Sequence, residues 1–116
     1  MEKVELLAPA GDLERLKLAF KYGADACYLG GKDFSLRANA KNFSIEDLKE
    51  AADYAHSLNK KIYVTVNIIF HNEDLEGLID YLKKLAEIKV DAVIVSDLAV
   101  VNIIKDNNID LEVHLS

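Results

Sequence analysis

Five short apolar segments alternate with four amphipathic stretches along this chain, and this alternation constrains the fold more than any single motif. The apolar segments are residues 4–7, 26–29, 62–66, 92–95 and 111–115. A regular alternation of strand and helix predicts a parallel sheet built from right-handed crossover connections. The spacing is close to the roughly 30 residues per unit of an eight-unit (β/α) barrel of about 250 residues. We therefore predict an α/β fold that is TIM-barrel-like but incomplete, with about five strands and four helices of a larger barrel.

The length and composition fit a single domain over residues 1–116. Because five strands cannot close such a barrel, we expect the N-terminal segment of a longer protein, with the rest of that chain as a partner. Exposed sheet edges are also expected to favour a homo-oligomer. No apolar run approaches the roughly 18 residues that cross a bilayer, and the N-terminus lacks a signal-peptide pattern. We therefore expect a cytoplasmic protein without a membrane partner.

The charge balance bears on nucleic-acid binding. Fourteen basic and twenty acidic residues give a formal net charge of −6. Because phosphate binding needs clustered lysine and arginine, this segment is not expected to bind nucleic acid alone. Contacts with nucleic acid would come from other regions of a longer protein.

Several residues mark the ends of the predicted helices. Asp12 and Ser44 are suited to begin the first and second helices, and Gly23 to end the first. Asn72 is expected to begin the third helix, and residues 98–105 are predicted to form the fourth.

Two local patterns are predicted to be turns. Residues 9–11, Pro-Ala-Gly, are expected to form the turn after the first strand. Asp25 and Asp91 each precede an alanine and an apolar strand, two strand–helix units apart. We interpret this repeat as a turn between helix and strand, used twice.

A complete flavodoxin-like domain, such as a response-regulator receiver, is the alternative fold. A receiver needs carboxylates beyond strands one and three to hold Mg²⁺. Here the first strand is followed by Pro-Ala-Gly and the third by Asn67. The two folds also differ in strand order, which is 1-2-3-4-5 in the barrel and 2-1-3-4-5 in the receiver.

Functional groups of a parallel barrel gather at the C-terminal ends of its strands. Read with this rule, the sequence offers seven candidate substrate-binding residues. They are Glu5, Tyr28, Gly30, Gly31, Arg37, Asn67 and His114.

Glu5 and Arg37 are the charged members of this set. A carboxylate inside an apolar strand is unfavourable unless it is paired, and Arg37 is a candidate partner for Glu5, in a binding site or in a structural salt bridge. Arg37, in the long loop 32–43, is also the best anion-binding candidate, with a solvated arginine as the alternative. Backbone N–H groups of Gly30 and Gly31 could meet an anion, although a plain turn is favoured. Asn67 suits either a hydrogen bond to a ligand or a turn.

No catalytic residue is assigned. His114, Ser116 and Asp97 are the residue types of a catalytic triad, but nothing in their spacing fixes the required geometry. Cys27 is predicted to be an inert buried thiol with a raised pKa. His56 and His71 have no neighbour at metal-ligand spacing, so both are predicted to lie on the surface and no metal site is expected.

Taken in order, residues 5–11, residues 23–31 with Phe34 and Arg37, residues 63–67, residues 91–97 and residues 114–116 resemble the N-terminal part of peptidase family U-32, the collagenase-like proteases. The resemblance implies a TIM-barrel-like domain in a protein of several hundred residues. Some members are labelled peptidases. Others, as the resemblance implies, act in hydroxylation of tRNA or ribosomal RNA bases or of a ubiquinone precursor. Those members hold a four-iron, four-sulfur cluster on four cysteines, and the RNA-modifying ones are linked to prephenate.

The function expected first is therefore the barrel segment of a U-32 peptidase, a hydrolase by family label, inactive alone. The alternative is a segment of an iron–sulfur RNA hydroxylation enzyme, in which Arg37 contacts a substrate carboxylate. A small non-catalytic flavodoxin-like binding module is the second alternative. Cys27 does not match the family's cluster-binding cysteines, so no cofactor is expected in this segment and a four-iron, four-sulfur cluster would belong to the full-length protein.

Overall fold

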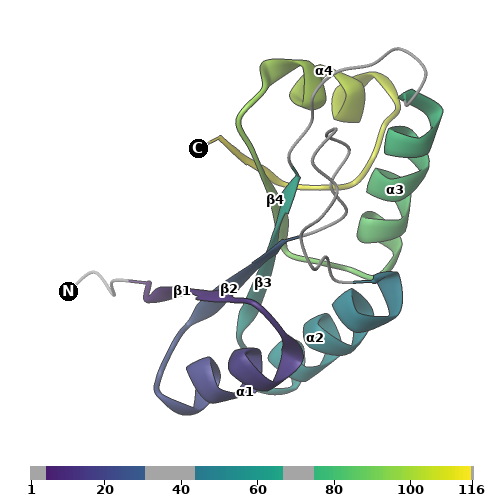
Figure 1. The fold of residues 1–116 in the computed structure, drawn as a ribbon. Helices are drawn as coiled ribbons and strands as arrows, with labels where there is room; N and C mark the ends of the chain where they lie inside the picture. Colours follow the sequence, from purple (N-terminus) through teal and green to yellow (C-terminus); the bar gives the residue numbers. More distant parts are fainter. Residues whose placement is uncertain (1–4, 31–43, 67–74, 116) are drawn as a thin grey trace.

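The computed structural model describes residues 5–30, 44–66 and 75–115 (Figure 1). Strands and helices alternate along these residues. They are β1 (Leu7–Ala10), α1 (Leu13–Lys21), β2 (Ala26–Gly30), α2 (Ile45–Ser57), β3 (Lys61–Val66), α3 (Leu75–Glu87), β4 (Ala92–Val95), α4 (Leu98–Asp106) and β5 (Val113–Leu115). None of the helices in these ranges is long and apolar enough to span a membrane.

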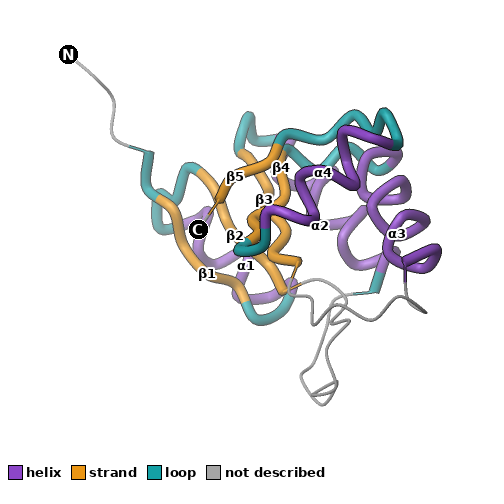
Figure 2. The backbone as a smooth tube through the Cα atoms, turned by 90° about the horizontal axis from the view of Figure 1, so that it is seen from above, coloured by secondary structure: helices purple, strands orange, loops and turns teal. Residues whose placement is uncertain are grey.

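All strands of the described sheet are parallel, in the order β1-β2-β3-β4-β5. This order confirms the barrel-like prediction and excludes the receiver order. The strands lie along an arc, with the helices on its convex side (Figure 2). Buried helix residues pack in one cluster with strand residues such as Cys27, Val64 and Val93. The cluster on the opposite face of the sheet contains strand residues alone among the described residues.

The helix-covered face of the sheet, which we call the outer face, contains the main hydrophobic core. Leu16 of α1, Leu48 of α2 and Leu82 of α3 have no exposed surface, and neither do Ile62 and Val64 of β3. Each such side chain contributes about 1.5–3 kcal/mol relative to an exposed one. Packing of aliphatic residues on this face therefore holds the four helices to the sheet.

The first strand differs from its prediction. We expected a strand over residues 4–7 and a turn over 9–11, but β1 runs from Leu7 to Ala10 and Pro9 pairs with Tyr28 of β2. β1 is an edge strand of the described sheet. A proline is tolerated at such an edge because the N–H that it lacks is not needed by a second neighbour. Residue 4 lies outside the described residues.

The predicted helix starts are confirmed where the structure describes them. The Asp12 side chain accepts a hydrogen bond from the Arg15 backbone N–H at 2.7 Å, and Ser44 accepts one from Asp47 at 3.1 Å. Each bond satisfies an N–H that has no partner within the first helical turn. Asn72, the expected start of the third helix, lies outside the described residues.

All four described helices end in the same way. Gly23 follows α1 with a φ of +102°, which confirms the predicted stop. The residues at the same position after the other helices also have positive φ: Asn59 at 58°, Lys89 at 65° and Asn108 at 52°. After α1, the N–H groups of Gly23 and Ala24 bond to the Phe20 and Ala19 carbonyls, which is a Schellman motif. This shared ending turns the chain back toward the sheet after every helix.

Candidate functional site

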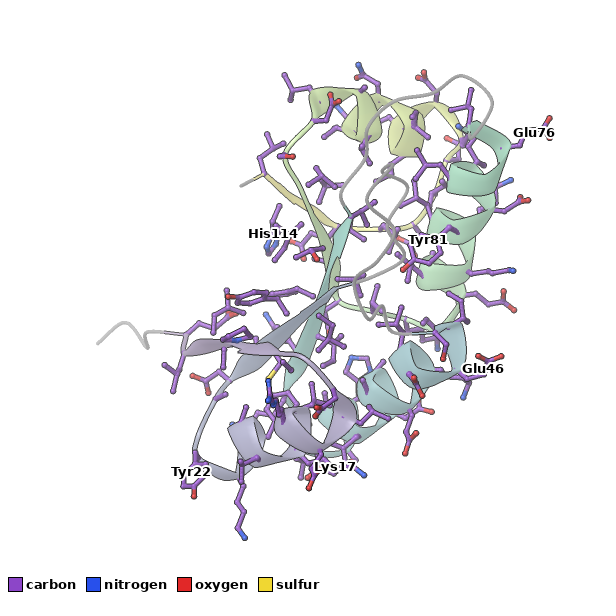
Figure 3. The ribbon with its side chains drawn as sticks, in the orientation of Figure 1. Lys17, Tyr22, Glu46, Glu76, Tyr81 and His114 are labelled. Carbon is purple, nitrogen blue, oxygen red and sulfur yellow. The ribbon has the colours of Figure 1, made fainter. Side chains whose placement is uncertain are left out.

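The concave face of the sheet, which we call the inner face, carries the polar side chains of the strands. Successive strand residues point to opposite faces. In the register of the sheet, Tyr28, Tyr63 and Ala92 are aligned on this face, and Ile94 pairs with His114 one step further on. Figure 3 shows His114 on the side of the strands away from α3 and its Tyr81.

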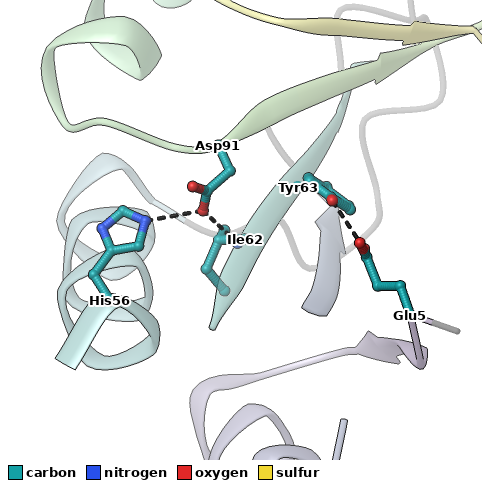
Figure 4. A network of polar contacts seen from close by, with 5 residues as sticks. All are labelled: Glu5, His56, Ile62, Tyr63 and Asp91. Atoms are coloured by element: carbon teal, nitrogen blue, oxygen red, sulfur yellow. Dashed lines mark hydrogen bonds and ion pairs between the residues drawn. The ribbon is translucent and has the colours of Figure 1, made fainter. Parts of the chain in front are cut away.

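Tyr63 is the central residue of the inner face. It packs between Ala26 and Ala92, whose small side chains leave room for its ring, and it is 5% exposed. Its hydroxyl donates a hydrogen bond of 2.9 Å to Glu5 Oε1 (Figure 4). This bond joins the third strand to the residues just before β1.

The surroundings of Tyr63 keep it protonated. Burial raises the pKa of Tyr63 to about 12, and the hydrogen bond to Glu5 and the nearby carboxylates of Glu5, Asp91 and Glu112 act in the same direction. Its hydroxyl therefore remains a hydrogen-bond donor to Glu5 throughout the neutral range.

His114 extends the aromatic surface of the inner face. Its ring lies 5.0 Å from that of Tyr63, centroid to centroid, at an interplanar angle of 59°. Its Nε2 lies 3.8 Å from Glu112 Oε2. Asp97 instead caps α4 by accepting a hydrogen bond from the Ala99 N–H at 2.9 Å. With Ser116 outside the described residues, this part of the structure contains no serine–histidine–aspartate arrangement around His114.

The other candidates fall into two groups. Tyr28 is partly buried on the inner face, and Gly30 is exposed at the end of β2. Gly31, Arg37, Asn67 and His71 lie outside the described residues, so the predicted surface position of His71 stays a prediction. The expected Glu5–Arg37 pair stays a prediction because Arg37 is outside these residues. Within the described residues, Tyr63 is the hydrogen-bond partner of Glu5.

The sequence analysis did not select Tyr63 as a site residue. A signal was present in the alternation along β3, where Ile62, Val64 and Val66 are aliphatic while Tyr63 and Thr65 carry hydroxyl groups. The pattern places the two hydroxyls on one face of the sheet. It does not reveal that Tyr63 reaches across β2 to Glu5.

A second polar network lies at the N-terminal edge of the sheet (Figure 4). Asp91 Oδ2 accepts a hydrogen bond of 2.7 Å from the Ile62 N–H and lies 2.9 Å from His56 Nε2. Asp25 Oδ2 accepts one of 2.9 Å from the Leu6 N–H, and its Oδ1 lies 3.6 Å from Lys60 Nζ. Asp91 therefore binds the backbone of the preceding strand β3, and Asp25 binds the backbone of the residue just before β1. In a parallel barrel this end contributes to stability rather than catalysis.

His56 lies at the surface, as predicted, with 37% of its side chain exposed. Its contact with Asp91 joins residues 35 positions apart. Spacing along the sequence could not have shown this contact.

The residues of this chain do not fit an iron–sulfur cluster. Such a cluster needs several thiolates, and the sequence contains one cysteine, Cys27. Cys27 has no exposed surface, and burial raises the pKa of its thiol to about 11, which confirms the predicted buried thiol with a raised pKa. Among the described residues, no group of three or more histidine, cysteine and acidic side chains could hold a metal ion.

Comparisons with known proteins agree with this architecture. The chain is 49% identical to tRNA hydroxylation protein P1 of Bacillus subtilis over 115 residues, which cover 99% of this chain and 27% of that protein. It is 47% identical to an uncharacterized protease of Methanocaldococcus jannaschii, over 100% of this chain and 28% of that protein. The chain thus spans about a quarter of the length of these curated relatives.

A solved structure and a family model also match nearly the whole chain. The structure of the U32 peptidase Mk0906 superimposes with a TM-score of 0.72 at 16% identity, covering 100% of this chain and 51% of that one, which supports the fold. The family model described as peptidase family U32 matches residues 11–116. The chain therefore belongs to peptidase family U32.

Proposed function

We propose that this chain is the barrel segment of a U32 protein that takes part in RNA hydroxylation, with tRNA as its substrate. The observation that carries the proposal is the 49% identity, over almost the whole chain, to a relative named for tRNA hydroxylation. The peptidase function that we expected first is supported by the family name and by a relative called an uncharacterized protease. A relative from Porphyromonas gingivalis named collagenase is less similar, at 36% identity over 97% of this chain.

The described side chains also give little support to a peptidase. Peptide hydrolysis needs an activated nucleophile or a metal-bound water. Cys27 is fully buried and Asp97 caps α4. The acidic group beside His114 is Glu112, at 3.8 Å. The described residues thus contain no activated nucleophile.

The role that we assign to this chain is to form one wall of the substrate site. The inner face presents Glu5, Tyr28 and His114 around the buried Tyr63. Aromatic rings and a fixed carboxylate suit the recognition of an unstacked base, which RNA-binding proteins bind by stacking and by hydrogen bonds to its edge. Because one buried thiol does not fit a cluster, we assign no redox step to these residues. The oligomeric partner and the cytoplasmic location remain predictions.

A chimera tests the proposal. The 116 residues of this chain would replace the matching stretch of the Bacillus subtilis protein, in a strain whose tRNA hydroxylation has been abolished by deletion. We expect hydroxylated nucleosides to return in total tRNA, measured by liquid chromatography and mass spectrometry. Tyr63→Phe should lower their amount, while Tyr22→Phe, a matched change at an 80% exposed tyrosine, should not.

One result of the same experiment would overturn the proposal. A chimera that accumulates normally, leaves tRNA unmodified and cleaves gelatin after purification would overturn RNA hydroxylation and restore the peptidase function. Immunoblotting of the chimera separates this result from a failure to fold.

A further inference from the structure

A groove lies between α1 and α2 on the outside of the molecule, away from the inner face. Its volume is about 510 Å³, and its lining includes Lys17 and Leu18 of α1, Tyr54 of α2 and Leu58 directly after α2. Leu18 is 50% exposed and Leu58 is 44% exposed. A surface that packed against these side chains would remove their apolar area from water, which contributes about 25 cal/mol for each Å².

The two helices that border the groove carry opposite net charges. α1 contains three basic residues and one acidic residue, which give +2. α2 contains four acidic residues and one lysine, which give −3 with His56 neutral. Among the described residues, no ion pair involves Lys17 or Lys21 of α1 or Glu50 of α2. Charges of both signs are therefore available to a partner at this surface.

Aromatic contacts fix the two helices relative to each other. The rings of Phe20 and Tyr54 are 6.3 Å apart, centroid to centroid, and Lys17 Nζ lies 5.4 Å from the centre of the Tyr54 ring. α1 and α2 run in the same direction because they connect consecutive parallel strands. Phe20 and Tyr54 thus lie at the same height along the helices. About one turn earlier, Lys17 lies at the height of Glu50.

This surface is complementary to itself. A two-fold axis parallel to the helices would place α1 of each copy in the groove of the other copy, against its α2. Such a rotation keeps every residue at its height along the axis, so Lys17 of one copy would face Glu50 of the other, twice in the dimer. Leu18, next to Lys17, would be covered. We propose that α1 and α2 form a docking surface for a second copy of this chain, with basic α1 against acidic α2.

The size of the surface sets the expected strength of the dimer. Helices of 9 and 13 residues are about 14 and 20 Å long, and each is about 10 Å wide. Side by side, they offer roughly 350 Å² on each copy. A standard interface buries about 800 Å² on each partner. We therefore expect a weak dimer, with a Kd on the order of 100 μM.

Analytical ultracentrifugation of the chain, from about 10 μM to about 1 mM, measures this equilibrium. Lys17→Glu and Glu50→Lys each bring like charges together at both contacts, so each should weaken association about tenfold. An equimolar mixture of the two variants should restore association, because both contacts of the mixed dimer join opposite charges again. Lys83→Glu and Glu87→Lys, matched reversals at exposed positions of α3, should leave it unchanged.

The mixture separates docking from effects within one chain, and circular dichroism of each variant checks that its helices are intact. A chain that stays monomeric up to about 1 mM would overturn the proposal. A dimer that neither reversal weakens would overturn it too, because association would then use another surface, such as the sheet edges. A mixture that stays as weak as its components would show that Lys17 and Glu50 do not meet across the interface, and this also overturns it. None of these results depends on RNA hydroxylation.

Discussion

The outer and inner faces of the sheet belong to the same strands, but aliphatic packing dominates the outer face and polar contacts occur on the inner face. In β3, Ile62, Val64 and Val66 point outward and are 0–1% exposed against the helices. Tyr63, between them, points inward and bonds to Glu5. The outer face gains stability from close aliphatic packing, whereas the inner face keeps polar groups in fixed positions. The comparison teaches that stability and binding chemistry can alternate residue by residue along one strand.

The largest expected effect distinguishes a buried residue of the outer face from an exposed residue on the same helix. Leu16 is fully buried and Leu18, on the same helix, is 50% exposed. We expect Leu16→Ala to lower the free energy of unfolding by about 2–5 kcal/mol, because it removes buried surface and leaves a cavity. Leu18→Ala is the matched control and should change it by less than about 1 kcal/mol. Urea unfolding followed by circular dichroism measures both, and equal losses would contradict the outer-face core.

The second effect concerns the N-terminal edge of the sheet, where Asp91 binds the backbone of β3. Asp91→Ala should lower the free energy of unfolding by about 1–3 kcal/mol, because the partly buried Ile62 N–H loses its acceptor. Asp110 occupies the equivalent position after α4 and is exposed without a hydrogen bond to a described residue. Asp110→Ala should therefore have little effect in the same assay. A similar loss in both variants would show that the Asp91 bond is not specific.

A smaller effect is expected on the inner face. Tyr63→Phe removes one hydrogen bond and should lower the free energy of unfolding by about 0.5–1.5 kcal/mol, because exposed Glu5 regains water. Tyr22→Phe, at an exposed position, should leave it unchanged. If Tyr63→Phe destabilised the chain as strongly as Leu16→Ala, the inner face would be a second core and the contrast between the faces would fail.

The least pronounced effect appears at alkaline pH. Tyr63 has a pKa of about 12 in the folded chain, above its ordinary value of 10. The folded state therefore holds its proton more tightly, so this contribution is complete below pH 10 and is lost as the pH rises toward 12. Urea midpoints should fall across this interval, and the fall should be smaller in Tyr63→Phe. An identical fall in both proteins would assign the effect to other groups, such as Cys27, whose pKa is raised to about 11.

Much of the fold could be predicted because its signals are local. Asp12, Ser44 and Gly23 mark helix ends through bonds and dihedral angles within a few residues. The first strand was placed too early because Pro9 looks like a turn residue, and its tolerance depends on the edge position of β1. Edge position is a property of the assembled sheet, so no local rule supplies it.

The candidate site was predictable to a lesser extent. The rule that functional groups gather at strand ends selected Glu5, Tyr28 and His114, but the structure places Glu5 before the start of β1 rather than at its C-terminal end. Tyr63 was missed because its partner lies 58 residues away, and the reach of its ring depends on the small side chains of Ala26 and Ala92. The repeat of Asp25 and Asp91 was visible in the sequence, but their bonds to the backbone at Leu6 and Ile62 were not.

By itself, the sequence determined the order of strands and helices, the alternation of faces and the burial of Cys27. These follow from hydrophobic periodicity and from side-chain chemistry, which act over short distances along the chain. Only the tertiary structure decided that Glu5 meets Tyr63, that His114 lies against the same ring and that Asp91 joins His56 to β3. Such contacts depend on sheet register and curvature, which many distant residues set together through packing.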